Sequence, residues 1–127
     1  MIDFKNSSVF KLKPIAIEDA REDFHKFIID GEEIIAAFKT IRDQVVFTNK
    51  RVIAANVQGL TGSKVEYHSV PYKAITHFKV ESSGHFDLDS ELKIYISGQS
   101  QPITKELRKG DDIVAIQQTL ANCVLGG

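Results

Sequence analysis

The stretch that decides the fold is residues 34–57, IIAAFKTIRDQVVFTNKRVIAANV. It holds three short runs rich in β-branched and aromatic residues, 34–39, 44–48 and 52–57, separated by the turn signals Arg42-Asp43 and Asn49-Lys50. These connections are too short for the crossover that a parallel strand pair needs. The stretch therefore predicts three consecutive antiparallel strands.

The same pattern continues toward the C-terminus. Four more strand-like runs follow at residues 64–70, 76–81, 92–97 and 102–107. In the later runs apolar and polar residues alternate, as in Leu92, Ile94 and Ile96, which is typical of a sheet with one face in water. Residues 31–108 therefore predict a seven-stranded antiparallel barrel or sheet.

The first three runs do not alternate, because they are apolar on both faces. Something must cover their outer surface as well as their inner one. Two covers remain open: the N-terminal helix predicted below, or a neighbouring subunit.

Helical patterns flank the strands. In the N-terminal segment 1–30, Ile17, Ala20, Phe24, Phe27 and Ile28 recur at helical spacing after Pro14, and Gly31 is placed to end that helix. Residues 110–125 place Ile113, Ile116, Leu120 and Cys123 on one face, which predicts a helix capping an open end of the sheets. We expect residues 1–127 to form one domain.

Composition limits the function classes. The chain has 127 residues, 43% of them hydrophobic and 26% charged, which suits a globular protein. Its formal net charge of -1 provides no general attraction to nucleic acid or to anionic membranes. Cys123 is the only cysteine, so a reducing compartment fits. Neither a signal peptide nor a membrane-spanning run is recognisable, and we expect a cytoplasmic protein.

The sequence predicts neither a catalytic site nor a cofactor. It lacks the GxSxG, GxGxxG, Walker and HExxH motifs, and Cys123 lies on the apolar face of the last helix. His85, Asp87, Asp89 and Glu91 fall at alternate positions and would share one face of an extended segment. That face could be a solvated hairpin, a partner-binding surface or a metal site, and the last is the weakest reading because a calcium loop needs more oxygen ligands.

Several motifs together resemble the bacterial pleckstrin-homology (PH) family. They are Gly31-Glu32-Glu33-Ile34, residues 41–53, Gln58-Gly59-Leu60-Thr61-Gly62, Val70-Pro71-Tyr72-Lys73, Gly84-His85-Phe86-Asp87-Leu88-Asp89 and Glu91-Leu92-Lys93-Ile94. The resemblance implies a mainly β, PH-like, seven-stranded antiparallel split barrel capped by a C-terminal helix. It also implies cyclic self-association into a ring of about five subunits, protein binding and no known catalytic activity.

We therefore expect a non-enzymatic domain that forms a cyclic homo-oligomer and binds an unknown protein through a polar surface. The candidate partner-binding residues are Arg42, Asp43, Lys50, Arg51, His85, Asp87, Asp89 and Glu91. The side chains of Asp43 and Thr48 could instead bond turn backbone. Charge reversal at Lys50 and Arg51 is expected to leave the melting temperature nearly unchanged, since solvated substitutions have small effects.

The alternative function is a peripheral membrane or lipid-binding module. The hairpin at residues 39–43 is short and contains an acid, so specific phosphoinositide binding is not expected. Nucleic acid binding is not expected either, because Tyr72-Lys73 and the Lys93/Tyr95 pair join no larger basic stripe.

Overall fold

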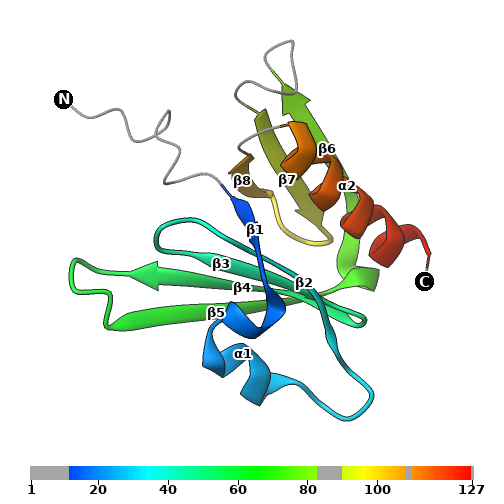
Figure 1. Ribbon diagram of the computed structural model, residues 1–127. Helices are drawn as coiled ribbons and strands as arrows, with labels where there is room; N and C mark the ends of the chain where they lie inside the picture. Colours follow the sequence, from blue (N-terminus) through cyan, green and yellow to red (C-terminus); the bar gives the residue numbers. More distant parts are fainter. Residues whose placement is uncertain (1–11, 83–89, 108–109, 127) are drawn as a thin grey trace, which may run out of the picture.

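The computed structural model describes residues 12–82, 90–107 and 110–126 (Figure 1). Eight strands run through this part of the chain: β1 Lys13–Ile15, β2 Ile34–Lys39, β3 Gln44–Thr48, β4 Arg51–Gln58, β5 Lys64–Pro71, β6 Ile75–Ser82, β7 Ser90–Ile96 and β8 Ile103–Leu107. Two α-helices, α1 Glu22–Phe27 and α2 Gly110–Leu125, and two short 3-10 helices, η3 Ile17–Asp19 and η4 Tyr72–Ala74, complete it. None of the helices described is long and apolar enough to cross a bilayer.

The strands form two antiparallel sheets. The five-stranded sheet has the order β1-β2-β3-β4-β5 and the three-stranded sheet the order β6-β7-β8. The predicted mainly β architecture is confirmed, and so are all seven predicted strands and the C-terminal helix. The sequence missed β1, a three-residue strand that contains Pro14 and pairs with β2.

The N-terminal strand joins the two sheets. Lys13 and Ile15 pair with β2, while the backbone N–H of the buried residue Leu12 donates to the Glu106 carbonyl on β8 at 2.9 Å. The N-terminal strand thus closes one of the two openings between the sheets of the split barrel. At the other opening, the chain passes from β5 through η4 into β6.

The main core lies between the sheets and α2. Phe38, Phe47 and Leu92 point into it from the strands, and Ile116 and Leu120 seal it from α2. The alternation in β7 is confirmed, because every second residue from Ser90 to Ile96 is buried. Figure 1 shows α2 alongside the three-stranded sheet, with α1 on the far face of the five-stranded sheet.

A second core explains the two-sided apolar strands. Ala37, Val46 and Ile53 face away from the barrel and are covered by Ala20 and Phe24 of the N-terminal segment. Phe24 has no exposed surface. Of the two covers left open by the sequence, the N-terminal segment therefore occupies this face, and no neighbouring subunit is needed to hide it.

The sequence predicted one continuous N-terminal helix, and this prediction is wrong. It is broken into η3 and α1, because Ala20 and Arg21 adopt extended backbone angles. The N–H of Arg21 donates to the Gln44 side-chain oxygen at 2.9 Å instead of continuing a helix. Gly31 does not end the helix, which stops at Phe27; with φ of 80°, Gly31 lies in the turn closed by Glu32 N–H and the Ile29 carbonyl.

Candidate functional site

The four candidate residues of the first two turns do not form one surface. Arg42 and Asp43 precede β3, whereas Lys50 and Arg51 follow it. A five-residue strand spans roughly 17 Å, so the two pairs lie at opposite ends of the sheet. A partner cannot engage both pairs through a single small contact.

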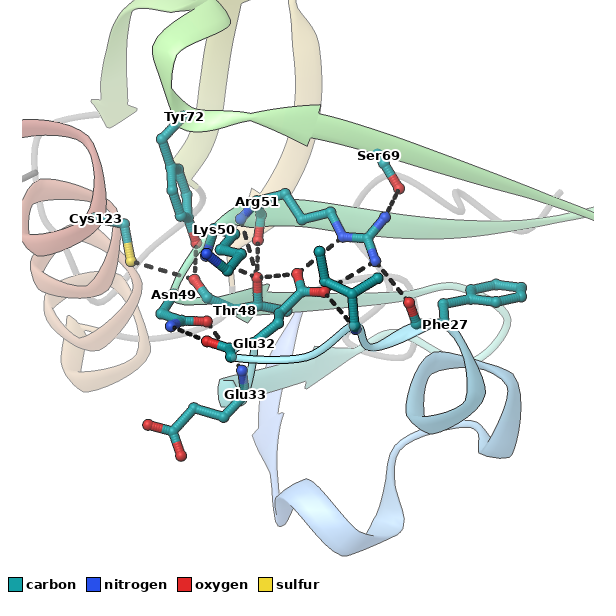
Figure 2. A network of polar contacts seen from close by, with 12 residues as sticks. Phe27, Glu32, Glu33, Thr48, Asn49, Lys50, Arg51, Ser69, Tyr72 and Cys123 are labelled. Carbon is teal, nitrogen blue, oxygen red and sulfur yellow. Dashed lines mark hydrogen bonds and ion pairs between the residues drawn. The ribbon is translucent and has the colours of Figure 1, made fainter.

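Arg51 belongs to a buried network around Glu32, drawn in Figure 2. The Glu32 side chain has no exposed surface. Its carboxylate accepts hydrogen bonds from Arg51 Nε at 2.9 Å and Nη2 at 3.1 Å, from Thr48 Oγ1 at 2.7 Å and from the Ile29 N–H at 3.2 Å. Burial alone would raise the pKa of Glu32, but these bonds outweigh it and hold the pKa below its ordinary value. Glu32 therefore stays ionised inside the fold.

The remaining donors of Arg51 are also used. Nη2 donates to the Phe27 carbonyl at 2.9 Å and Nη1 to Ser69 Oγ at 3.1 Å, so four of the five guanidinium N–H groups have partners. Arg51 thus ties β4 to the end of α1 and to β5. Arg51 is therefore not the solvated turn residue that the sequence indicated, and we expect reversal of its charge to lower stability. Its binding to a partner stays a prediction.

The turn between β3 and β4 is itself part of this network. Thr48 Oγ1 accepts from the N–H groups of Lys50 and Arg51 at 3.0 and 2.9 Å, as the turn interpretation of Thr48 predicted. Asn49 binds the backbone of Gly31 and Glu33 through its side-chain amide. Lys50 is exposed, and its ammonium has no partner within the part of the chain that the structure describes.

Cys123 and Tyr72 lie behind the same turn. The Tyr72 hydroxyl donates to the Thr48 carbonyl at 2.6 Å, and Cys123 Sγ lies 3.9 Å from that oxygen (Figure 2). Burial is the main cause of a raised pKa at Tyr72, with smaller effects of Cys123 and Glu32. The tyrosine is therefore a neutral donor that anchors the turn beside α2, which agrees with a structural role for Cys123.

Arg42 and Asp43 make ties at the other end of the sheet. Arg42 Nη2 donates to the Gly59 carbonyl at 2.6 Å and so holds the β2–β3 hairpin beside the β4–β5 hairpin. Asp43 Oδ1 accepts from the Val57 N–H at 2.9 Å, and its Oδ2 lies 3.9 Å from Lys105 Nζ. The Asp43 side chain thus bonds backbone, but that of strand β4 rather than that of its own turn as the sequence suggested, and Arg42 also has a structural role that the sequence did not reveal.

Of the four candidates between residues 85 and 91, only Glu91 is described. His85, Asp87 and Asp89 lie outside the described residues. Glu91 stands in register between Glu81 and Glu106 on the three-stranded sheet. Hydrogen bonds from Lys93, at 2.9 Å, and Lys79, at 3.1 Å, lower the pKa of Glu81. Across residues 12–82, 90–107 and 110–126, no three His, Cys, Asp or Glu side chains are grouped as a metal site.

Several spaces bounded by described residues could admit another molecule, and one of about 290 Å³ is lined by Arg21, Glu22 and Asp23. The space enclosed by the barrel side chains measures about 10 Å³, enough for about one water molecule. A larger groove of about 280 Å³ lies between β6 and α2. It is lined by Val80, Ile113, Val114, Gln117 and Gln118.

The sequence analysis missed the exposed apolar side chains. Leu60, at the tip between β4 and β5, is fully exposed, and Ile41, at the adjacent tip, is 63% exposed. Val114, on the α2 side of the groove, is 48% exposed. The available signal was a leucine inside a turn, between Gly59 and Gly62, where no core position exists for it.

Comparisons with known proteins agree with this architecture. The family model described as "Bacterial PH domain" matches residues 3–124. The chain is 49% identical over 102 residues to the uncharacterized protein YjqA of Bacillus subtilis, covering 80% of this chain and 82% of that relative. A PH-domain protein from Shewanella loihica has a crystal structure with TM-score 0.78 and 50% identity, covering 90% and 97% of the two chains. A PH domain from Shewanella amazonensis gives TM-score 0.74 and 49% identity, covering 88% and 90%. The chain belongs to the bacterial PH domain family.

Proposed function

We propose that this protein is a non-enzymatic binding module that assembles into a cyclic homo-oligomer and recruits a protein partner. The proposal rests on the difference between the side chains that hold the fold together and those that are exposed to solvent. Polar groups such as Glu32, Arg42 and Arg51 are engaged in holding the fold, whereas large apolar groups such as Leu60 are presented to solvent. Contiguous exposed apolar groups commonly mark interaction sites.

The site geometry supports a non-enzymatic role. Glu32 is the most deeply buried carboxylate of the network; it is ionised and hydrogen-bonded, and it lines none of the spaces described among residues 12–82, 90–107 and 110–126. A general acid or base needs a pKa near the working pH and access to a reacting atom. Glu32 has neither, so its chemistry is that of a structural ion pair.

Self-association is supported by two kinds of exposed surface. Within the described residues, the outer edges of β5 and β6 pair with no other strand. Open edges offer unpaired backbone groups to a second chain. Seven large apolar side chains are also exposed in the part of the chain that the structure describes: Phe27, Ile29, Ile35, Ile41, Leu60, Val114 and Leu125.

We propose that the protein partner binds at polar positions that have no structural role in the fold. Lys50 projects from the β3–β4 turn, and Glu91 belongs to the acidic row on the three-stranded sheet. In a ring each position is repeated, and a weak contact becomes strong when several copies are engaged at once. His85, Asp87 and Asp89 remain candidates from the sequence alone.

Light scattering after gel filtration tests the assembly. At micromolar concentration we expect a mass larger than that of a dimer, about five subunits; a monomer mass overturns the proposal. The partner surface is tested by pull-down with Lys50→Glu, and Lys73→Glu, another exposed lysine, is the matched control. We expect the protein recovered by the wild type to be lost with Lys50→Glu only. Equal recovery with both variants removes Lys50 from the partner surface.

A further inference from the structure

We infer that the outer face of the three-stranded sheet carries a binding site for a nucleoside monophosphate. The site is formed by His77 and Lys79 on β6 and by Lys93 and Tyr95 on β7, which together we call the ring-and-lysine cluster. The strand register places His77 beside Tyr95 and Lys79 beside Lys93, and alternate residues of a strand share one face. This inference goes beyond the proposed protein-binding function and does not depend on it.

The two rings of the cluster form a flat stack. The His77 and Tyr95 rings have centroids 4.2 Å apart and planes inclined by 11°, whereas the buried pair Phe38 and Phe47 meets edge to face. Thr76 Oγ1 donates to the Tyr95 carbonyl at 3.3 Å and lies 3.1 Å from His77 Nδ1, which holds the imidazole in place.

One side of this stack is open to solvent. In the part of the chain that the structure describes, β6 is the last strand of its sheet, and His77 is exposed. The side of the imidazole that faces away from Tyr95 therefore has no neighbouring strand. Nucleic acid bases stack on aromatic side chains, histidine included, so a base can extend the stack there.

The two lysines supply positive charge next to the rings. Lys79 Nζ and Lys93 Nζ lie 3.1 and 2.9 Å from the two carboxylate oxygens of Glu81, so two positive charges share one negative charge. Like charges placed opposite each other on neighbouring strands repel. Lys79 Nζ also lies 5.6 Å from the centroid of the Tyr95 ring, which brings its charge to the stack. A phosphate group beside these ammonium groups would supply the missing negative charge through charge-assisted hydrogen bonds.

The spacing of rings and lysines matches the two ends of a nucleotide. Successive residues on one face of a strand are roughly 7 Å apart, and this is the distance from the His77–Tyr95 pair to the Lys79–Lys93 pair. In a nucleoside monophosphate a ribose separates the flat base from the phosphate by a comparable distance. A base stacked on His77 therefore leaves its phosphate within reach of Lys79.

The neighbouring acids limit the ligand to one phosphate group. Glu81 and Glu91 face each other at the next position along the strands, and Glu106 stands opposite Glu91 on β8. Further phosphates that extended past the lysines would meet these carboxylates and be repelled. The same row opposes a polynucleotide, in agreement with the net charge of -1. The ligand is therefore a mononucleotide and not a nucleic acid.

Saturation-transfer difference NMR on the full chain tests the site, because it observes the ligand and tolerates a large assembly. The probes are adenosine monophosphate, adenosine, ribose phosphate and adenosine triphosphate. We expect saturable transfer to the base protons of the monophosphate. Adenosine and ribose phosphate should each bind at least about tenfold more weakly, since each lacks one of the two contacts. The triphosphate should also bind more weakly than the monophosphate.

Substitutions at exposed positions distinguish this site from general attraction. His77→Ala removes the stacking surface and should weaken binding of the monophosphate about tenfold, whereas His77→Trp keeps a flat ring and should retain it. Lys79→Gln should weaken binding by a similar factor, about tenfold, because it removes a charged donor. The matched controls are His25→Ala on α1 and Lys73→Gln on η4, which are also exposed and should leave binding unchanged.

Several results would overturn the inference. They are a lack of transfer to the monophosphate, equal binding of ribose phosphate and the monophosphate, and unchanged binding by His77→Ala. Equal weakening by the control variants would also overturn it, because the attraction would then be general. Light scattering and pull-down measure the proposed function separately, so failure of nucleotide binding leaves that function standing, and a monomeric protein that binds the monophosphate leaves this inference standing.

Discussion

Replacing Arg51 by methionine tests the role of the Glu32 network in stability. Methionine keeps an apolar stem but removes the charge, and the fully buried Glu32 carboxylate would keep only its bonds from Thr48 and Ile29. Removing one partner of a buried ion pair costs about 3–5 kcal/mol. The Arg51 side chain is 24% exposed, so we expect the lower end, about 3 kcal/mol. With an unfolding entropy of about 2.1 cal/mol/K per residue over 127 residues, the melting temperature falls by about 10 °C.

Urea unfolding followed by circular dichroism measures this loss, at one fixed protein concentration because assembly couples stability to concentration. Lys50→Met is the matched control: it removes the same charge one residue away, from an exposed side chain, and should change stability by less than about 0.5 kcal/mol. Adding Glu32→Leu to Arg51→Met should recover part of the loss, because no buried charge is then left unpaired. A loss below about 1 kcal/mol for Arg51→Met, or an equal loss for Lys50→Met, would refute the reasoning.

Three further measurements follow from the structure. Because the pKa of Glu32 is lowered in the folded protein, its ionised form stabilises the fold at pH values above the ordinary carboxyl pKa. This stability is lost as the pH falls through the pKa of Glu32 in the folded protein. Between about pH 6 and pH 3, urea unfolding should therefore show a smaller decline in stability for Glu32→Gln than for the wild type. Phe24→Ala should cost about 3–5 kcal/mol in the same assay because Phe24 is fully buried, whereas Phe27→Ala, at a partly exposed position, should cost clearly less. At physiological ionic strength, the protein should not bind vesicles containing phosphatidylserine and should stay in the supernatant. Arg42 and Arg51 are engaged in hydrogen bonds at opposite ends of the sheet, and each basic residue contributes only about 1 kcal/mol to membrane binding. Binding to the vesicles that added salt abolishes would contradict this prediction.

Local chemistry predicted most of the fold. The bounds of β2, β3 and α2 coincide with those expected from the sequence, because turn residues and apolar periodicity specify them without long-range information. The failures lie where distant residues decide. The break at Ala20 and Arg21 depends on Gln44, which is 23 positions from Arg21, and β1 forms only because β2 offers it an edge.

The candidate site was harder to predict for the same reason. Lys50 and Arg51 are adjacent, basic and at a turn, and no local pattern separates them. They differ because Glu32, 19 positions before Arg51, accepts hydrogen bonds from Arg51, whereas Lys50 is left in solvent. By contrast, the separation of Arg42 from Arg51 follows from strand geometry alone, since consecutive hairpin turns lie at opposite ends of the strand that joins them.

The motifs that carry the family resemblance can now be divided by what they do. Gly31-Glu32-Glu33 and Thr48-Asn49-Lys50-Arg51 meet in one hydrogen-bonded network, so most of their polar side chains are explained by folding and say little about binding. The segment Gly59-Leu60-Thr61-Gly62 differs. Its glycines are explained by their positive φ angles, but nothing in the described chain explains a leucine that is fully exposed between them. A side chain that has no structural role inside its own protomer is the best candidate for a contact between protomers. Leu60 is therefore the residue at which function should be tested first.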